Sequence, residues 1–520
     1  MRQTSVALPF TQLARHLTFP WRASYYVFAG VSLGGYLLMS TSNGFSGFPL
    51  DDAWIHQTYA RNLAQYGEWS FIPGEPSAGS TAPLWSAILS VGYFLGLHPL
   101  IWNFILGCVL LGSLGLIAST GLGYLSFRSA KRLSLAGVFF IFEWHLVWAA
   151  GSGMETLLFA LIALFILVRL NSPDFMNDPY TLEEAGLSGL WRRFRWAIIG
   201  MLIGLSAWVR PDGITLLGPA GFVLWMKATD RNHKIRQSIQ LTAGFLLLFL
   251  PYLLFNNHAA GALWPNTFYA KQAEYAIYRQ IPVIRRALTE ASLPLVGAGS
   301  VLLPGFLLYL NQCIKVKNWP RLAIGLWVCG YLGLYALRLP AVYQHGRYVI
   351  PVMPAYFLAG LAGFFQFWIT TSNKTFSRIL KKSALVSGGI LLAVFWLLGG
   401  RAFANDISII ESEMVTTANW VAGNTPHDAI IAAHDIGALG YYGNRQILDL
   451  AGLVSPEVIP MIRDENQLSD FIGQSGAAFL MTFPAWYPEL TDQGRLVFQT
   501  HGTAPSLGGE NMAVYRWLGP

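Results

Sequence analysis

Charged residues are scarce in this chain of 520 residues: they make up 12% of the sequence, against about 25% in soluble globular proteins. Hydrophobic residues make up 54%, and they fall in long runs. The composition excludes an ordinary soluble protein and predicts a polytopic α-helical membrane protein. Trp, Tyr and Phe contribute 14% of the residues, as expected for aromatic anchors at two membrane interfaces.

Cysteine is also rare. Cys108, Cys313 and Cys329 all lie in or beside apolar runs, which argues against a disulfide framework. No Cys–His set has the spacing of metal ligands, so the sequence predicts no metal-binding residues. The first apolar run lacks a small-residue cleavage site after it, and we interpret it as a retained signal-anchor span.

Lysine is absent from residues 402–520. This region holds thirteen Asp or Glu residues against four Arg, a net charge of −9, so that the rest of the chain carries +16. A basic part joined to an acidic part suggests two compartments. The positive charges are scattered through short loops, which argues against a nucleic-acid partner.

Apolar runs long enough to span a membrane, or nearly so, predict the spans. They lie near 24–42, 83–97, 133–150, 154–170, 196–209, 213–227, 238–257, 296–311, 322–337, 348–369 and 383–401. The run 100–126 is ambiguous, being either one long span or two short ones.

Basic loops predict the orientation, because short loops rich in Lys and Arg stay in the cytoplasm. Their charges include Arg2, Arg15, Arg128, Lys131, Arg132, Arg192, Lys227, Arg236, Lys315, Arg321, Lys374 and Lys382. We therefore expect a multi-pass protein of the plasma membrane with a cytoplasmic N-terminus. The first outer loop is 43–82, the large outer loop is 258–295, and the C-terminal region is extracytoplasmic. The orientation assigned forwards from the N-terminus agrees with that assigned backwards from the C-terminal region only if 100–126 crosses the membrane twice. This predicts about thirteen spans.

Two domains follow from these patterns. Residues 1–401 form the membrane module. In residues 402–520, short apolar strands alternate with turn residues and helical stretches, which predicts a soluble α/β domain.

The first outer loop opens with Asp51 and Asp52. From Asp52, apolar residues recur at helical spacing to Tyr66, which predicts an amphipathic helix along the membrane surface. A carboxylate there can act as the base that accepts a proton when a sugar is transferred to a hydroxyl. It can equally cap the helix through its side-chain oxygen. Two adjacent aspartates allow both roles.

Further polar residues are expected at the same outer level: Glu155, Arg210, Asn266, Tyr269, Lys271, His345 and Arg347. A lipid phosphate needs permanent cations and directed donors, which Arg347, Arg210, Lys271 and Tyr269 can supply. The alternative is that these side chains reach to lipid headgroups from the span ends.

Several motifs together resemble the GT-C superfamily of membrane glycosyltransferases. They are Asp51-Asp52, the run Gly-Ser-Thr-Ala-Pro-Leu-Trp85, Ser-Gly-Met-Glu155-Thr, Arg210-Pro-Asp-Gly, Pro-Asn266-Thr-Phe-Tyr269-Ala-Lys271 and His345-Gly-Arg347-Tyr. The chain is most similar to bacterial members with the dolichyl-phosphate-mannose mannosyltransferase-like fold, and more narrowly to the mycobacterial terminal arabinofuranosyltransferase group. His-Asp-Ile-Gly-Ala-Leu-Gly, from His434, extends the resemblance into the C-terminal region.

The resemblance implies a hexosyl- or pentosyltransferase that takes sugar from a polyprenyl-phosphate donor, held among membrane lipids. The acceptor is a hydroxyl of a glycan, lipid or protein, and the transfer inverts the anomeric carbon. The catalytic acid maps onto Asp51 or Asp52, with Asp52 preferred because Asp51 has the simpler capping role. Glu155 matches a second acidic residue, Arg347 matches the basic residue near the carrier phosphate, and His345 and Asn266 join the substrate-binding set. Some relatives bind a divalent cation and others do not, so a cofactor stays open.

Two other functions remain in competition. A transporter or flippase of lipid-linked sugars would also have many spans, but such proteins often show internal repeats with matched broken helices, and the sequence has none that we detect. A non-catalytic relative that only binds a lipid-linked sugar is the other alternative. The paired aspartates argue mildly against it.

Overall fold

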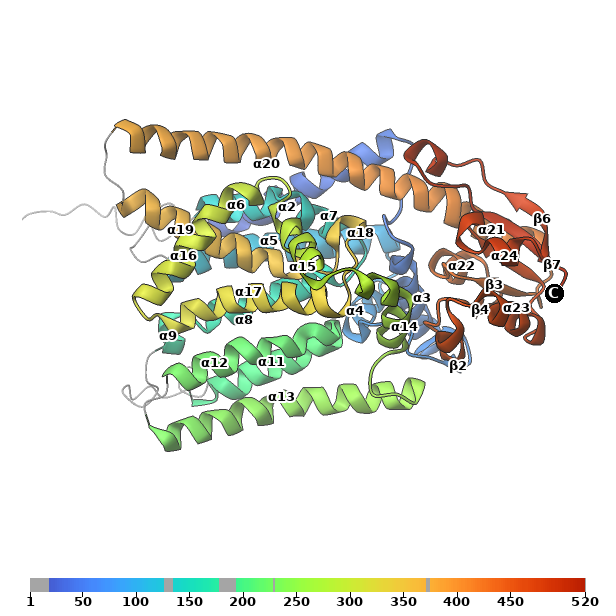
Figure 1. The fold of residues 1–520 in the computed structure, drawn as a ribbon, viewed down its shortest axis with the longest axis horizontal. Coiled ribbons are helices and arrows are strands. Elements are labelled where there is room, and N and C mark those ends of the chain that lie inside the picture. Colours follow the sequence, from blue (N-terminus) through green and yellow to red (C-terminus); the bar gives the residue numbers. More distant parts are fainter. Residues whose placement is uncertain (1–17, 126–133, 177–192, 228–229, 371–374, 520) are drawn as a thin grey trace, which may run out of the picture.

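Long helices and an α/β domain occupy opposite ends of the long axis (Figure 1). This computed structural model describes residues 18–125, 134–176, 193–227, 230–370 and 375–519. The basic residues 2, 15, 128, 131, 132, 192 and 374, which helped to predict the orientation, lie outside the described residues.

The bundle consists of helices that run between its two ends. They are α2 (Thr18–Ser42), α5 (Pro99–Leu125), α6 (Ser134–Phe142) followed by α7 (Trp144–Gly151), α8 (Thr156–Arg169), α11 (Arg195–Val209), α12 (Leu217–Lys227), α13 (Arg231–Ala260), α16 (Gly299–Lys315), α17 (Trp319–Arg338), α19 (Met353–Thr370) and α20 (Thr375–Ile409). In the described part of the chain, five helices are long and apolar enough to cross a membrane, or six if one bent pair counts as a span. The α-helical membrane fold is confirmed, whereas the count of thirteen spans is not.

The predicted double crossing of 100–126 is wrong, because α5 is one continuous helix of 27 residues. At 1.5 Å per residue it is about 40 Å long, enough for one crossing. Its glycines do not bend it; they let other helices approach. A Cβ on Gly107 would lie 2.3 Å from the Ala150 carbonyl oxygen, and one on Gly112 would lie 2.6 Å from the Tyr26 ring.

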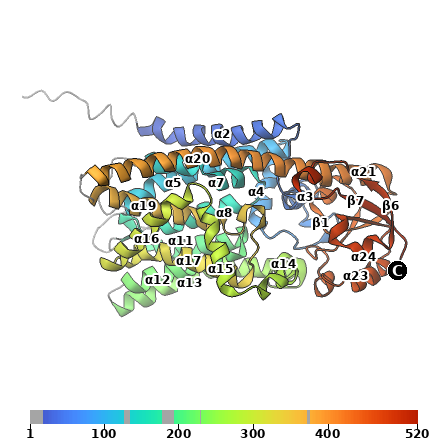
Figure 2. The ribbon, with the colours of Figure 1, turned by 45° about the horizontal axis from the view of Figure 1, so that its top comes forward.

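The predicted span at 83–97 is also wrong. This segment forms α4 (Pro83–Phe94), which at about 18 Å is too short for the roughly 30 Å hydrocarbon core. The Trp85 indole donates to the Gly153 carbonyl and the Tyr93 hydroxyl to that of Tyr441, in the C-terminal domain. Figure 2 shows α4 between the bundle and that domain. The two errors cancel, so loop 43–82 and the C-terminal domain still lie at the same end of the bundle.

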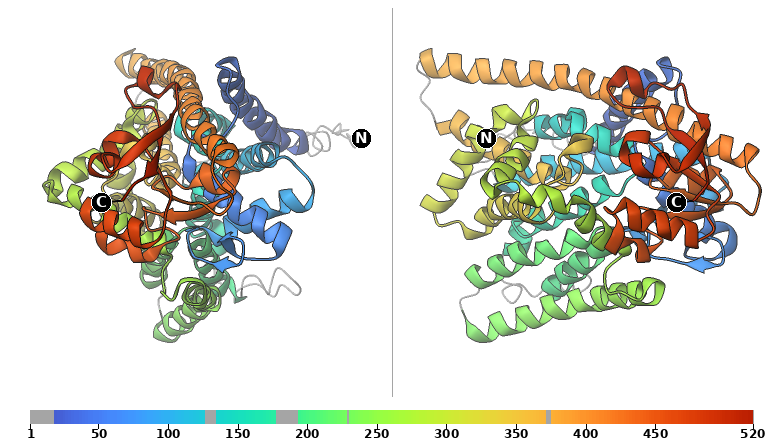
Figure 3. Two further views of the ribbon diagram at one scale, coloured as in Figure 1. Left: turned by 90° about the vertical axis from the view of Figure 1, so that its right-hand side faces the viewer. Right: turned by 45° about the vertical axis from the view of Figure 1, so that its right-hand side comes forward.

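The C-terminal domain contains a five-stranded sheet in the order β4-β3-β5-β7-β6. Strands β3 (Ile430–Ala433), β4 (Gln446–Asp449) and β5 (Phe479–Thr482) are parallel, while β7 (Ala513–Trp517) pairs antiparallel with β5 and with β6 (Gly494–Gln499). The domain's helices include α22 (Gly437–Tyr442), α23 (Glu465–Gln474) and α24 (Pro488–Thr491). In the end-on view of Figure 3, this domain lies in front of the helix ends.

The predicted domain boundary at residues 401 and 402 falls inside a helix. Helix α20 continues through a π-helical turn (Ile410–Val415) into α21 (Thr416–Asn424), and the sheet begins only at Ile430. No loop marks the boundary, because one continuous helical segment runs from the bundle into the domain.

Two outer segments lie between the bundle and this domain. The first contains α3 (Asp51–Tyr66) and the short pair β1 (Ser70–Ile72) and β2 (Glu75–Pro76); the second contains α14 (Asn266–Glu274) and α15 (Val283–Ser292). Helix α3 was predicted, but not its surroundings. Most of it is buried, from Asp51 to Asn62, because α4 and α22 pack against it.

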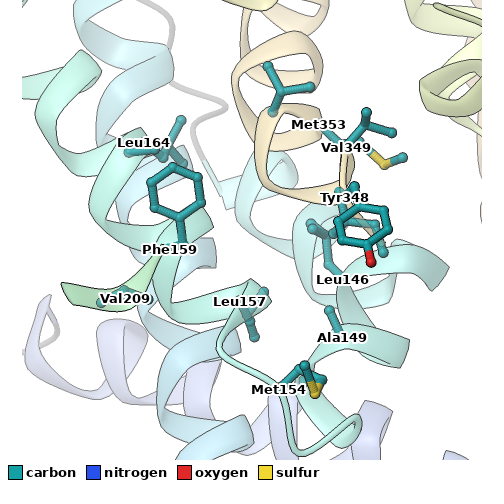
Figure 4. Close-up of a cluster of buried hydrophobic side chains, with 14 of the residues drawn as sticks. Leu146, Ala149, Met154, Leu157, Phe159, Leu164, Val209, Tyr348, Val349 and Met353 are labelled. Atoms are coloured by element: carbon teal, nitrogen blue, oxygen red, sulfur yellow. The ribbon is translucent and has the colours of Figure 1, made fainter. Parts of the chain in front are cut away.

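An apolar core supports the turns at this end of the bundle (Figure 4). Leu146 and Ala149 of α7 and Leu157 of α8 lie on either side of the turn at 152–155 and are at most 2% exposed. Val349 and Met353 bring the chain after Arg347 into the same cluster. Close packing in this cluster fixes the turn at 152–155, which carries Glu155, and the segment that carries Arg347.

Candidate active site

Asp52 lies in the first turn of α3 and pairs with two cations from distant parts of the chain. Its Oδ2 accepts hydrogen bonds from Arg347 Nη2 at 2.6 Å and from Lys271 Nζ at 3.3 Å. Burial opposes ionisation of Asp52, but the charges of Lys271 and Arg347 outweigh it and hold its pKa well below the usual range. The carboxylate is therefore ionised at neutral pH, and 27% of its side chain remains exposed.

Arg347 is buried, and two of its three guanidinium nitrogens lack a hydrogen-bond partner among the described residues. Nη2 also donates to the Tyr348 hydroxyl at 3.0 Å, whereas Nε and Nη1 have no hydrogen-bond partner among the described residues. A buried donor without a partner is costly. This half of the guanidinium is consequently ready to bind an anion.

Asp51 does not cap its own helix, so that interpretation is wrong. The N-cap of α3 is Leu50, without a side-chain hydrogen bond. The Asp51 carboxylate instead accepts from the backbone N–H groups of Gly437 at 2.6 Å and Ala438 at 2.8 Å. Burial raises its pKa to about 6, although these two N–H groups favour the ionised form.

Glu155 belongs to a second charged array, in the turns that follow α7 and α11. Its Oε1 accepts from Arg210 Nη1 at 3.2 Å, and Arg210 Nε donates to Asp212 at 3.1 Å. The hydroxyls of Tyr331 and Tyr335 also donate to Asp212. Glu155 is buried, which opposes ionisation, yet His56 and Arg210 lower its pKa to about 2.

His56, like Asp212 and Tyr335, is a site residue that the sequence analysis did not name as a candidate. Its Nδ1 lies 3.1 Å from the hydroxyls of both Ser80 and Ser86, which leaves Nε2 facing Glu155 Oε2 at 3.4 Å. That oxygen accepts no hydrogen bond within the described structure. The signal was the spacing from Asp52, since residues four apart share one face of a helix.

A cavity of about 310 Å³ joins the two arrays. Its polar lining comes from Asp52, His56, Thr81, Glu155, Arg210, Asp212, Lys271, Tyr335 and Arg347. Apolar residues such as Trp264 and Phe268 complete the wall. The structure thus brings together the predicted residues Asp52, Glu155, Arg210, Lys271 and Arg347.

Three predicted substrate-binding residues are not part of the cavity lining. His345 turns away, and its Nε2 pairs with Asp406 of α20 at 2.8 Å. Asn266 is buried at the start of α14, whereas the Tyr269 side chain is 39% exposed. These three residues are near Lys271 or Arg347 in the sequence, but their side chains do not line the cavity.

A divalent cation does not fit these residues. No three His, Cys, Asp or Glu side chains of the described ranges are arranged to hold a metal ion. Asp52, the most exposed carboxylate of the cavity, already faces two positive side chains, which would repel another cation.

Comparisons with known proteins agree with the architecture. Residues 405–515 match a domain of unknown function (DUF8728), and no curated protein matches the sequence. The structure is similar to ArnT from Cupriavidus metallidurans bound to undecaprenyl phosphate, with a TM-score of 0.58 and 13% identity over 94% of this chain and 97% of that one.

Archaeal oligosaccharyltransferases share this similarity. The Archaeoglobus fulgidus enzyme in its apo form has a TM-score of 0.59 at 10% identity, over 90% of this chain and 70% of that one. Its complex with an inhibitory peptide and a dolichol-phosphate has a TM-score of 0.57 at 12% identity, over 95% and 74%. The chain therefore shares its fold with ArnT and with this oligosaccharyltransferase, while the narrower arabinofuranosyltransferase group is not confirmed.

Proposed function

We propose that this protein is a glycosyltransferase that moves a hexose or pentose from a polyprenyl-phosphate carrier to a hydroxyl acceptor at the outer face of the plasma membrane. One observation carries the proposal: an ionised carboxylate, Asp52, and two cations, Arg347 and Lys271, meet in a single cavity at the end of an apolar bundle. The fold adds support, because similar structures hold undecaprenyl phosphate and dolichol-phosphate.

The carrier phosphate binds to the cations. Arg347 offers Nε and Nη1, which are free of partners among the described residues and suit two phosphate oxygens in a bidentate pair. Lys271 adds a point charge that is not tied to a particular geometry. The polyprenyl tail then lies among the membrane lipids, and the sugar projects into the cavity.

Asp52 acts as the base. The acceptor oxygen attacks the anomeric carbon from the side opposite the phosphate, the bond from that carbon to the phosphate oxygen breaks, and the acceptor proton passes to Asp52. The polyprenyl phosphate leaves with the bonding electrons, and Arg347 and Lys271 stabilise its charge. The anomeric configuration inverts. Phosphate binding also neutralises the cations that depress the Asp52 pKa, so the carboxylate becomes a better base when the donor arrives.

The second array faces the sugar. Glu155 is held by Arg210 and belongs to the array that lacks Arg347 and Lys271, the cations assigned to the phosphate, so we assign it to sugar hydroxyls rather than to the base. Its Oε2 can accept a hydrogen bond from a sugar hydroxyl, and His56 Nε2 lies beside it. The acceptor is a hydroxyl of a glycan, lipid or protein. Arg347 and Lys271 supply positive charge that balances the phosphate.

Mass spectrometry of lipids that copurify with the detergent-solubilised protein tests the proposal. We expect a polyprenyl-phospho-sugar, whose mass identifies the sugar class, and its conversion to polyprenyl phosphate when an acceptor is supplied. A carrier that crosses proteoliposome membranes with its sugar intact would identify a flippase instead. Binding without either outcome would indicate a non-catalytic relative.

A further inference from the structure

Helix α22 of the C-terminal domain is held at both ends by α3. At its N-terminus, the N–H groups of Gly437 and Ala438 donate to the Asp51 carboxylate. At its other end, the carbonyl oxygens of Tyr441 and Gly440 accept from Arg61 Nη1 at 2.7 Å and Nη2 at 3.3 Å. One outer helix therefore satisfies backbone groups at both ends of a helix more than 370 residues away.

The charges match the polarity of α22. The first N–H groups of a helix lack internal partners and carry partial positive charge, while the last carbonyls carry partial negative charge. An aspartate stands at the positive end and an arginine at the negative end. Reversed docking would place like charges together, so the pair fixes the direction in which α22 lies on α3.

Close packing fixes the distance between the two helices. A Cβ on Gly437 would lie 2.0 Å from the Asp51 carbonyl oxygen of α3, and one on Gly440 would lie 2.1 Å from the ring of Phe71 in β1, which follows α3. Between the two ends, the Trp54 indole packs against the ring of Tyr441, with ring centroids 4.7 Å apart. Direction and depth of the contact are both specified.

Asp52 directly follows Asp51, and this adjacency gives the contact a consequence for catalysis. Among the described residues, the polar partners of the Asp52 side chain are Lys271 and Arg347, and these are the cations that a carrier phosphate would engage. Once the phosphate binds, the position of Asp52 depends on the backbone of α3. That backbone is anchored one residue earlier by α22.

We infer that the C-terminal domain is a positioning clamp for the catalytic base, with Asp51 and Arg61 as positioning residues. This inference rests on the proposed function. It gives the domain of unknown function a role: it holds the first turn of α3 still while the phosphate binds to the partner-free edge of Arg347 and shares the charge of both cations with Asp52. A displacement of about 1 Å in a reacting group can lower a rate roughly 100-fold.

Two variants and a matched control test the clamp in the full-length protein. Asp51→Asn keeps the shape but places an NH₂ group against one backbone N–H, and Arg61→Gln removes the charge at the other end. Asp464→Asn is the control, because Asp464 also receives a backbone N–H at a helix start, that of Gln467 at 3.1 Å, in the same domain but away from α3.

We expect kcat to fall about 10- to 100-fold in Asp51→Asn and Arg61→Gln, with the Kd for undecaprenyl phosphate unchanged. Hydrogen–deuterium exchange in α3 should become faster in both variants, and Asp464→Asn should match wild type in all three measurements. Unchanged kcat with faster exchange would refute the catalytic role, and unchanged exchange would refute the clamp itself.

The outcomes separate this inference from the proposed function. If wild type binds undecaprenyl phosphate and transfers sugar but Asp51→Asn does so equally well, the clamp fails alone. If wild type neither binds nor transfers, the proposed function fails and the role in catalysis fails with it. Hydrogen exchange in α3 still decides whether α22 orders that helix.

Discussion

Arg347 donates from Nη2 to the Asp52 carboxylate at 2.6 Å, while its Nε and Nη1 have no hydrogen-bond partner in the described ranges. One guanidinium therefore connects the carboxylate to an edge whose two donors have no partner among the described residues. Because the group is planar and rigid, an anion on that edge is placed at a fixed distance from Asp52. The geometry suits a reaction in which a base and a leaving phosphate act on the same carbon.

Replacing Asp52 with Asn should abolish sugar transfer, because the amide cannot accept the acceptor proton. A general base contributes about 10²- to 10⁴-fold to a rate, so we expect a loss of at least about 100-fold. The Kd for undecaprenyl phosphate should stay the same or fall, since Arg347 and Lys271 lose a competing anion. Single-turnover transfer and equilibrium binding measure the two effects, and full activity of Asp52→Asn would rule out this base.

Replacing Arg347 with Gln should weaken carrier binding. Hydrogen bonds to charged groups contribute about 1.5–3 kcal/mol, so the Kd for undecaprenyl phosphate should rise about 10- to 100-fold. Arg347→Lys should recover only part of this affinity, because lysine keeps the charge but loses the bidentate edge. Arg279→Gln, which alters an exposed arginine of the large outer loop 258–295, is the control. An equal rise in Kd in that control would contradict the assignment.

How far the sequence predicted this site can be seen from neighbouring residues. His345 and Arg347 are two positions apart, and the sequence analysis placed both in the site. Backbone geometry separates them: His345 and Gly346 have φ values of +58° and +69°, so the chain turns sharply, sending His345 towards Asp406 and Arg347 towards Asp52. Hydropathy and charge contain no information about such a turn.

The membrane part shows a similar limit. Hydropathy found the helices, but it could not distinguish α4, a short apolar helix that packs against α3 at the bundle end, from a span. The partner of Asp51 was equally out of reach, because α22 lies almost 390 residues further along the chain. Local sequence patterns predict the secondary structure of a segment, whereas the residues that pack against it are set by the tertiary fold.

Replacing Gly437 with Ala should disturb the contact between α3 and α22. The added Cβ would lie 2.0 Å from the Asp51 carbonyl oxygen, so the helices must separate, at a cost of about 1–3 kcal/mol. We expect a lower Tm and a lower kcat. Gly423→Ala is the control, because its Cβ would have no atom within 4 Å and α21 is a helix that alanine favours. A normal kcat in Gly437→Ala would contradict the prediction.

Cysteine labelling should establish the orientation. With Cys108, Cys313 and Cys329 replaced by Ala, Ser506→Cys in the C-terminal domain should react with a membrane-impermeant maleimide in intact cells. Asn232→Cys lies in the first turn of α13, and this helix begins at the end of the bundle opposite the C-terminal domain (Figure 1). It should react only after permeabilisation, because its surroundings include the basic residues Lys227 and Arg231. The reverse pattern would place the cavity on the cytoplasmic side.

Activity should decline as the pH falls through about 6, because Asp51 is then protonated. Burial raises its pKa to about 6, and a protonated oxygen no longer accepts from the N–H groups of Gly437 and Ala438 as a carboxylate does. Of the groups that face Asp51, Asp52 stays ionised and His434 charged in this range, since their pKa values are shifted well down and well up. The pKa of Asp435 is raised to about 8 by burial, so it is already protonated.

Stability should respond in the opposite sense. A folded-state pKa above the unfolded value of 3.8 means that the native protein binds this proton more tightly, so the stabilising contribution of Asp51 is largest at low pH and is lost as the pH rises through about 6. Between pH 7 and pH 5 kcat should therefore fall, while Asp51 does not lower the Tm. Profiles of kcat and Tm for wild type and Asp51→Asn measure this, and the variant should lack the inflection near pH 6. An inflection retained in Asp51→Asn would assign the titration to another group.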